Sequence, residues 1–194
     1  CGATGSTDGD IINFKGTMGN GIAQACAVSG LEVTMVDISE AAVQKGLATI
    51  AGSLDRLIKK EKMTEEQKNA TLARIKTSTD YNAFKTTDMV IEAATENYDL
   101  KVKILKQLDS IVNDSVVIAT NTSSLSVTAL AASLKHPARF AGLHFFNPVP
   151  LMKVVEVIPG LATAPEVCDQ LTKLVQAMGH QAVRAQDTPG FIVN

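Results

Sequence analysis

Short apolar runs alternate with helical patterns along almost the whole chain, and this alternation restricts the fold more than any other feature. The runs are short and many are rich in β-branched residues, so each of them predicts a strand. Strands that alternate with helices favour a doubly wound, mostly parallel sheet, because parallel neighbours need a crossover connection. We therefore expect an α/β fold. The predicted strands are DIINF, EVTMVD, MVIEAA, VVIATN, FAGLHFF, VVEVI and QAVRA.

The segments between these runs have helical periodicity. The first helical pattern stops at Gly30, and the longest covers residues 39–74. Within the longest, Thr64 and Gln67 have the spacing of a capping box that restarts the helix after a break near Met63. This connection is longer than a simple crossover requires, so we expect a helical hairpin insertion after the second strand. Further helices are predicted over about residues 98–111, 126–134 and 165–178.

The turn after the first predicted strand has part of the glycine pattern of a dinucleotide-binding loop. Gly16 and Gly19 stand where the second and third glycines of such a loop stand, whereas Phe14 and Lys15 occupy the region of the first. Asp37 ends the second strand about 20 residues later, where a carboxylate accepts hydrogen bonds from the ribose hydroxyls and disfavours a 2′-phosphate. The pattern predicts NAD rather than NADP. Paired glycines at such a turn also serve helix packing alone.

The composition argues against several classes of partner. The chain has 18 Lys and Arg residues against 20 Asp and Glu residues, with few aromatic residues, so we expect no nucleic-acid partner. Cys1, Cys26 and Cys168 are scattered without metal-ligand spacing, so we expect neither a metal site nor a disulfide framework. No apolar run has the length of a membrane span. We expect a soluble, cytoplasmic protein without a membrane partner.

Residues 1–9 differ from the rest of the chain, because they are small, polar and lack an initiating Met. They are typical of a non-native leader. Their glycine-rich GATGST has no strand before it, so it lacks the context of a phosphate-binding loop. We assign residues 10–188 to one nucleotide-binding domain.

From residue 16 onward, the blocks GTMGNGIAQA, ATNTSSL, FAGLHFFNPVPLMKVVEVI and DTPGFIVN resemble the NAD-binding domain of the 3-hydroxyacyl-CoA dehydrogenases, most closely the short bacterial 3-hydroxybutyryl-CoA type. The resemblance implies a Rossmann-type fold, NAD as cofactor and an acyl-CoA substrate. It implies oxidation of a short-chain (S)-3-hydroxyacyl-CoA to a 3-oxoacyl-CoA, or the reverse reduction, in fatty acid or butanoate metabolism. It also implies that residues 189–194 begin a helical domain absent from this chain, and that full-length members are homodimers.

The same blocks contain candidate catalytic residues. His144 matches the family's catalytic base, and Glu156 matches the carboxylate that holds its tautomer. Ser123 and Asn147 match residues that bond the substrate oxygens and the nicotinamide ribose, and Asn194 matches a further polar residue of the catalytic site. Without the resemblance, His144 is typical of a core histidine and Glu156 of a solvent-facing strand residue. Ser123 and Asn147 are then ordinary turn or cap residues.

The resemblance also implies contacts to the two nucleotide-containing ligands. In the hairpin, Ser53 and Lys60 match positions that contact the coenzyme A moiety, and a lysine ammonium suits its phosphates. The basic residues around Lys60 are otherwise an ordinary solvated face. Glu96 and Lys101 match positions near the nicotinamide, with a solvated helix start as the alternative. The expected cofactor-binding residues are Gly16, Thr17, Met18, Gly19, Asp37, Glu96, Lys101, Ser123 and Asn147.

Three classes of function remain open at this stage. The first is a dehydrogenase acting on a 3-hydroxyacyl-CoA, with a gulonate-type dehydrogenase as the second choice of enzyme. The second is a nucleotide-binding domain without turnover. The side chain of Phe14 favours this second class, because that side chain crowds the pyrophosphate. The absence of the helical domain favours it as well. The third is a structural protein of the same ancestry, which no feature specifically supports.

Overall fold

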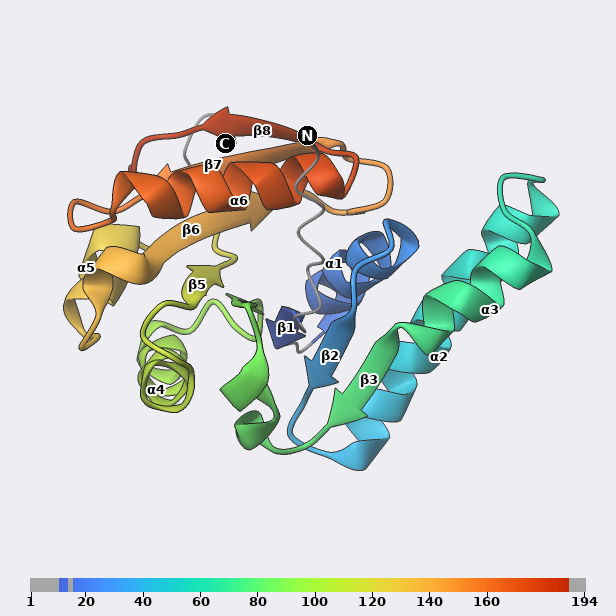
Figure 1. Ribbon diagram of the computed structural model, residues 1–194, viewed down its shortest axis with the longest axis horizontal. Helices are drawn as coiled ribbons and strands as arrows, with labels where there is room; N and C mark the ends of the chain where they lie inside the picture. Colours follow the sequence, from blue (N-terminus) through green and yellow to red (C-terminus); the bar gives the residue numbers. More distant parts are fainter. Residues whose placement is uncertain (1–10, 14–15, 189–194) are drawn as a thin grey trace, which may run out of the picture.

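The computed structural model describes residues 11–13 and 16–188, and in these residues one eight-stranded sheet carries helices on both faces (Figure 1). The strands are β1 (Ile11–Asn13), β2 (Val33–Val36), β3 (Ile75–Ser78), β4 (Met89–Glu92), β5 (Val117–Thr120), β6 (Phe140–Phe145), β7 (Val154–Pro159) and β8 (Gln181–Arg184). The helices are α1 (Gly16–Val28), α2 (Glu40–Lys59), α3 (Glu65–Ala73), α4 (Tyr98–Ile111), α5 (Val127–Ala132) and α6 (Pro165–Ala177), with short 3-10 turns η1 (Tyr81–Thr86) and η2 (Pro137–Arg139).

The order of the strands in the sheet is β3-β2-β1-β4-β5-β6-β7-β8. All neighbours are parallel except β6 and β7, which run antiparallel. Only residues 146–153 connect β6 to β7, and this connection contains no helix that could carry the chain back across the sheet. The prediction of a doubly wound, mostly parallel α/β fold is confirmed.

The core lies in two layers, one on each face of the sheet. On one face, α1, α2 and α6 pack on strand residues such as Met35, Ile91 and Leu143. On the other face, α4, α5 and η1 pack on residues such as Val36, Val90 and Ile118. Adjacent residues of one strand contribute to opposite layers, because side chains alternate across a strand. Both faces of β4 and β5 are therefore covered, which explains their continuous apolar sequences.

Local sequence signals fix most of the helix ends. Gly30 adopts a φ of +95°, which suits glycine, just after α1 ends. The predicted Thr64–Gln67 capping box is present at the start of α3, and Ser39 caps α2. α2 and α3 lie side by side after β2 and extend beyond the sheet (Figure 1). Sequence reasoning missed β3, because its residues IKTS closely follow a helix and include three polar or charged side chains.

Several expectations concern residues outside the described part of the chain. These are the leader at 1–9, the turn residues Phe14 and Lys15, and residues 189–194 with Asn194. Within the described residues, no helix is both long and apolar enough to cross a membrane.

Candidate active site

A cavity of about 370 Å³ lies at the carboxyl edge of the sheet, between the end of β4, the loop after β5 and the first turn of α1. The strands β1 and β4 are neighbours in the sheet. From β1 the strand order continues to β3 on one side, and from β4 it continues to β8 on the other. Open α/β sheets bind ligands at such a reversal of strand order. The residues that line the cavity are Met18, Ala93, Ala94, Thr95, Glu96, Asn121 and Ser123.

The first residue of α1 leaves room for the close approach of a phosphate. Gly16 adopts a φ of +83°, a conformation that side chains disfavour, and a Cβ built there meets no atom within 4 Å. The space next to Gly16 and the N-terminal N–H groups of α1 together fit a dinucleotide pyrophosphate. Gly19 is buried, as expected for the helix-packing glycine, and Met18 reaches the cavity. The side chain of Thr17 lies outside what the structure describes.

Asp37 follows β2, at the same edge of the sheet as Gly16. Its side chain is half-buried, and Oδ1 accepts a hydrogen bond from the Ile38 amide at 2.7 Å. A carboxylate held at the end of the second strand fits the adenine ribose of NAD. The turn, the cavity and Asp37 therefore suit a bound dinucleotide.

His144 and Glu156 form a buried pair on neighbouring antiparallel strands. They stand directly opposite each other in the β6–β7 register, and His144 Nδ1 lies 3.3 Å from Glu156 Oε1. Since a carboxylate oxygen accepts, Nδ1 donates. The His144 ring also packs on Phe146, with ring centroids 4.4 Å apart. His144 is 5% exposed and Glu156 is fully buried, so the interpretation of Glu156 as a solvent-facing residue is wrong.

Glu96 holds the loop that carries Ser123. Its carboxylate accepts hydrogen bonds from Thr122 Oγ1 at 2.9 Å, from the Ser123 amide at 3.2 Å and from Ser124 Oγ at 3.4 Å. Both Glu96 and Ser123 line the cavity. The structure thus brings together two predicted site residues that are 27 positions apart in the sequence.

Lys101 is buried below this loop. Its Nζ donates to both carboxylate oxygens of Glu92 at 2.8 and 2.9 Å, to Thr120 Oγ1 at 3.0 Å and to the Asn121 carbonyl at 2.9 Å. Both Lys101 and Glu92 are fully buried, so the alternative of a solvated helix start is wrong for Lys101. Burial raises the pKa of Glu92 above its ordinary value, against the opposing effect of Lys101. Sequence reasoning missed Glu92, although a carboxylate that ends an apolar strand was a visible signal.

Asp187, which follows β8, is a further carboxylate that the sequence did not reveal. Its oxygens accept from the Val127 amide at 2.8 Å, the Thr128 amide at 2.7 Å and Ser126 Oγ at 3.1 Å. Partial burial raises its pKa, but the hydrogen bonds from Thr128, Val127 and Ser126 outweigh burial and hold the pKa below its ordinary value. These bonds tie residue 187 to the segment that follows the Ser123 loop.

The remaining predicted residues do not line the cavity beside Ser123. Asn147 is exposed and precedes Pro148 across a cis peptide bond. Ser53 is half-buried on α2 and Lys60 is exposed at its C-terminal cap, and both belong to the helix pair that extends away from the sheet (Figure 1). Within the described residues, no group of three or more His, Cys, Asp or Glu side chains is arranged to hold a metal ion.

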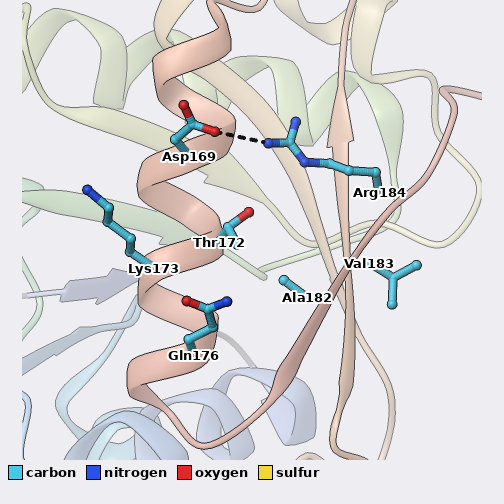
Figure 2. A pocket seen from close by; sticks show the side chains of 7 residues that line it. All are labelled: Asp169, Thr172, Lys173, Gln176, Ala182, Val183 and Arg184. Atoms are coloured by element: carbon cyan, nitrogen blue, oxygen red, sulfur yellow. Dashed lines mark hydrogen bonds and ion pairs between the residues drawn. The ribbon is translucent and has the colours of Figure 1, made fainter.

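A second cavity, of about 460 Å³, lies between α6 and β8 (Figure 2). Its lining includes Lys173 of the helix and Arg184 of the strand, and Arg184 Nη2 pairs with Asp169 Oδ1 at 3.4 Å. None of the predicted site residues lines it. Of these two cavities in the described part of the chain, the one at the carboxyl edge of the sheet therefore combines a helix N-terminus with residues expected from the sequence.

The fold and this site define a Rossmann-type dinucleotide-binding domain, and the family to which it belongs gives NAD as its cofactor. A sequence model described as the NAD binding domain of 3-hydroxyacyl-CoA dehydrogenase matches residues 14–188. The chain belongs to this family, and the predicted family is confirmed.

The chain is similar to several named dehydrogenases. The crystal structure of (S)-3-hydroxybutyryl-CoA dehydrogenase from Ralstonia eutropha is 59% identical with a TM-score of 0.93, over 96% of this chain and 66% of that one. The 3-hydroxyadipyl-CoA dehydrogenase of Escherichia coli is 46% identical over 93% of this chain and 38% of that protein. The 3-hydroxybutyryl-CoA dehydrogenase of Bradyrhizobium diazoefficiens is 41% identical over 92% and 61%. The chain spans less than two thirds of each relative.

Proposed function

We propose that this chain is the NAD-binding and catalytic part of a dehydrogenase that converts a short-chain (S)-3-hydroxyacyl-CoA to a 3-oxoacyl-CoA, or catalyses the reverse reduction. The buried His144–Glu156 pair is the observation that carries this proposal. His144 is next to Phe145, whose amide bonds the cavity residue Asn121 at 3.0 Å, so the pair belongs to the edge of the sheet that holds the cavity. The relatives named above supply the substrate class.

His144 acts as the base in the oxidation. Because Nδ1 donates to Glu156, Nε2 carries the lone pair and accepts the proton of the substrate hydroxyl. The ring then becomes an imidazolium, which the adjacent carboxylate stabilises. In the reduction His144 returns the proton to the forming hydroxyl.

Other residues bind and orient the reactants. A bound NAD would supply the acceptor for a hydride from C3 of the substrate. Ser123, held by Glu96 at the cavity wall, forms a hydrogen bond with the substrate oxygen. Asn147, which follows the end of β6 that carries His144, forms a second hydrogen bond with the reactants. The turn at Gly16 and the carboxylate of Asp37 bind the pyrophosphate and the adenine ribose.

The helix pair α2–α3 serves the other end of the substrate. Lys60 is exposed at the C-terminal cap of α2, where its ammonium can pair with the phosphates of coenzyme A. Ser53 lies two turns earlier on the same helix and adds a hydrogen-bonding hydroxyl. A long ligand such as an acyl-CoA is needed to join residues this far apart in the fold.

Turnover tests the role of the His144–Glu156 pair. With the protein at its full natural length, NADH formation from (S)-3-hydroxybutyryl-CoA is followed by absorbance. The substitution His144→Ala removes the base, so we expect kcat to fall by about 10²–10⁴-fold. Glu156→Gln should lower kcat as well, because the amide no longer favours the imidazolium. Wild-type turnover by the His144→Ala variant would refute the proposal.

Cofactor binding tests the nucleotide site without turnover. Calorimetric titration of the 194-residue chain should show NAD binding more tightly than NADP. Asp37→Ala should weaken NAD far more than NADP, because the lost partner is the hydroxyl that NADP carries as a phosphate. An equal loss for both cofactors would show that Asp37 has only a structural role.

A further inference from the structure

Asn121 lies between the two halves of the proposed active site and bonds to both. Its amide donates to the Glu92 carbonyl at 2.7 Å, and its carbonyl accepts from Lys101 Nζ at 2.9 Å. Its side-chain Oδ1 accepts from the Phe145 amide at 3.0 Å. The residue also lines the cavity at the carboxyl edge of the sheet. One residue therefore connects the ends of β4, α4, β5 and β6.

The side chain of Asn121 bonds to β6 beyond the point where the backbones of β5 and β6 stop pairing. The last register pair between the two strands is Thr120 with Gly142, yet β6 continues to Phe145. Phe145 is 2% exposed, so its amide needs a partner within the protein, and Asn121 Oδ1 supplies it. On the side that faces β5, the end of β6 that carries His144 is thus held by a side chain, whereas on its other side the ladder with β7 continues to Phe145.

The backbone of Asn121 fixes the other half of the site. Its amide and carbonyl are held by a strand residue and by a fully buried lysine, so its position is set by the core. Ser123 follows two residues later, and its own amide is held by Glu96. Ser123 and His144 are accordingly attached to the same rigid point, one through the main chain and one through Oδ1.

We propose that Asn121 is a positioning residue that sets the distance between the Ser123 loop and His144. Its effect on catalysis rests on the proposed function, whereas its effect on the Phe145 amide does not. Effects of this kind on turnover are large, because a shift of about 1 Å between reacting groups costs up to about 10²-fold in rate.

Three substitutions, each made in the protein at its full natural length, test this role. Asn121→Ala removes the acceptor, and Asn121→Asp keeps an oxygen in the same place. Asn113→Ala is the matched control, because Asn113 Oδ1 also accepts from a backbone amide, that of Ser115, at the opposite end of the strands. Hydrogen exchange of the Phe145 amide, kcat and KM are measured for each variant.

We expect Asn121→Ala to lose protection of the Phe145 amide and to lower kcat by up to about 100-fold, with KM changing much less. Asn121→Asp should restore the protection and most of kcat, and Asn113→Ala should change neither. Unchanged protection in Asn121→Ala would overturn the structural bridge, and lost protection with unchanged kcat would overturn the positioning role. A wild-type protein that fails to oxidise 3-hydroxybutyryl-CoA would instead count against the proposed function, and the exchange comparison would still decide the bridge.

Discussion

Within the described residues, two buried pairs of opposite charges lie at opposite ends of the parallel strands. At the carboxyl ends, Lys101 Nζ lies 2.8 Å from Glu92 Oε1. At the amino ends of β5 and β6, Arg139 Nη2 lies 2.7 Å from Asp109 Oδ1. The four side chains are at most 7% exposed, so the two pairs share nearly the same chemistry and burial.

The two pairs differ in what else they hold. The remaining bonds of Lys101 go to Thr120 and to the carbonyl of Asn121, which lines the cavity. The remaining bonds of Arg139 go to the carbonyls of Asp109, Asn113 and Val116, in the end of α4 and the turn before β5. A buried pair at the carboxyl edge therefore supports a loop that lines the cavity, whereas the same kind of pair at the amino edge only closes the fold.

The pair at the carboxyl edge is expected to show the largest effect when it is broken. Lys101→Met leaves the Glu92 carboxylate buried without its cation, which typically costs about 3–5 kcal/mol. It also removes the donor to the Asn121 carbonyl, so NAD affinity and kcat should fall together with stability. Urea unfolding and NAD titration measure the two effects.

The double variant Glu92→Gln with Lys101→Met separates the two effects. It removes both charges, so much of the lost stability should return, because neutral groups are cheaper to bury than an unpaired charge. NAD affinity and kcat should stay low, since the Asn121 carbonyl still lacks its donor. A single Lys101→Met variant as stable as the wild type would contradict the buried pair itself.

The pair at the amino edge is expected to affect stability alone. Arg139→Met leaves Asp109 buried without its cation, so the free energy of unfolding should again fall by about 3–5 kcal/mol. In the folded fraction, at low temperature, NAD affinity and kcat should equal those of the wild type. If Arg139→Met weakened NAD as strongly as Lys101→Met, the contrast between the two edges would be wrong.

Acid should weaken the amino edge, because it protonates the Asp109 carboxylate and leaves Arg139 charged. Burial opposes ionisation of Asp109, but hydrogen bonds from Arg139 and from the Lys135 amide, together with the charge of Arg139, hold its pKa below the ordinary value of 3.8. A carboxyl with a lowered pKa stabilises the fold fully above its ordinary value. That stabilisation is lost as the pH falls through the lowered pKa.

Urea midpoints measured at falling pH check this expectation. The midpoint should fall as the pH drops below about 4, and the fall should be smaller in Asp109→Asn, which has no carboxyl to protonate. An Asp109→Asn variant with the full wild-type pH dependence would assign the acid sensitivity to other carboxyls, such as Asp187.

Much of the fold could be predicted from the sequence, because local signals determine it. The apolar runs, Gly30 and the Thr64–Gln67 capping box gave most of the strands and helices. The β3 strand was missed, because an edge strand such as IKTS, covered incompletely, needs no continuous apolar run.

The site was predictable only in part, because long-range packing decides it. Motifs placed His144, Glu156 and Ser123, which the structure locates at the carboxyl edge of the sheet. No local pattern shows that Lys101 points into the core toward Glu92, since Lys101 lies near the start of a helix with several charged neighbours. The role of Asn121 depends on where two parallel strands stop pairing, and a single sequence does not contain that register.

The smallest expected effect comes from Asp187, which is half-buried. It follows β8, a strand that runs antiparallel to β6 and therefore ends at the amino edge of the parallel strands. Its oxygens accept from the Val127 and Thr128 amides, so Asp187→Ala removes a helix cap, which costs about 0.5–2 kcal/mol. Asp80→Ala is the matched control, because Asp80 caps η1 away from the cavity by accepting from the Asn82 amide.

The two variants should differ in function rather than in stability. The segment that Asp187 holds follows the Ser123 loop directly, so its release should raise KM for the acyl-CoA several-fold with NAD affinity nearly unchanged. Asp80→Ala should lower the urea midpoint by a similar amount and leave KM at the wild-type value. Equal KM values in both variants would show that Asp187, like the Arg139–Asp109 pair at the amino edge, only stabilises the fold.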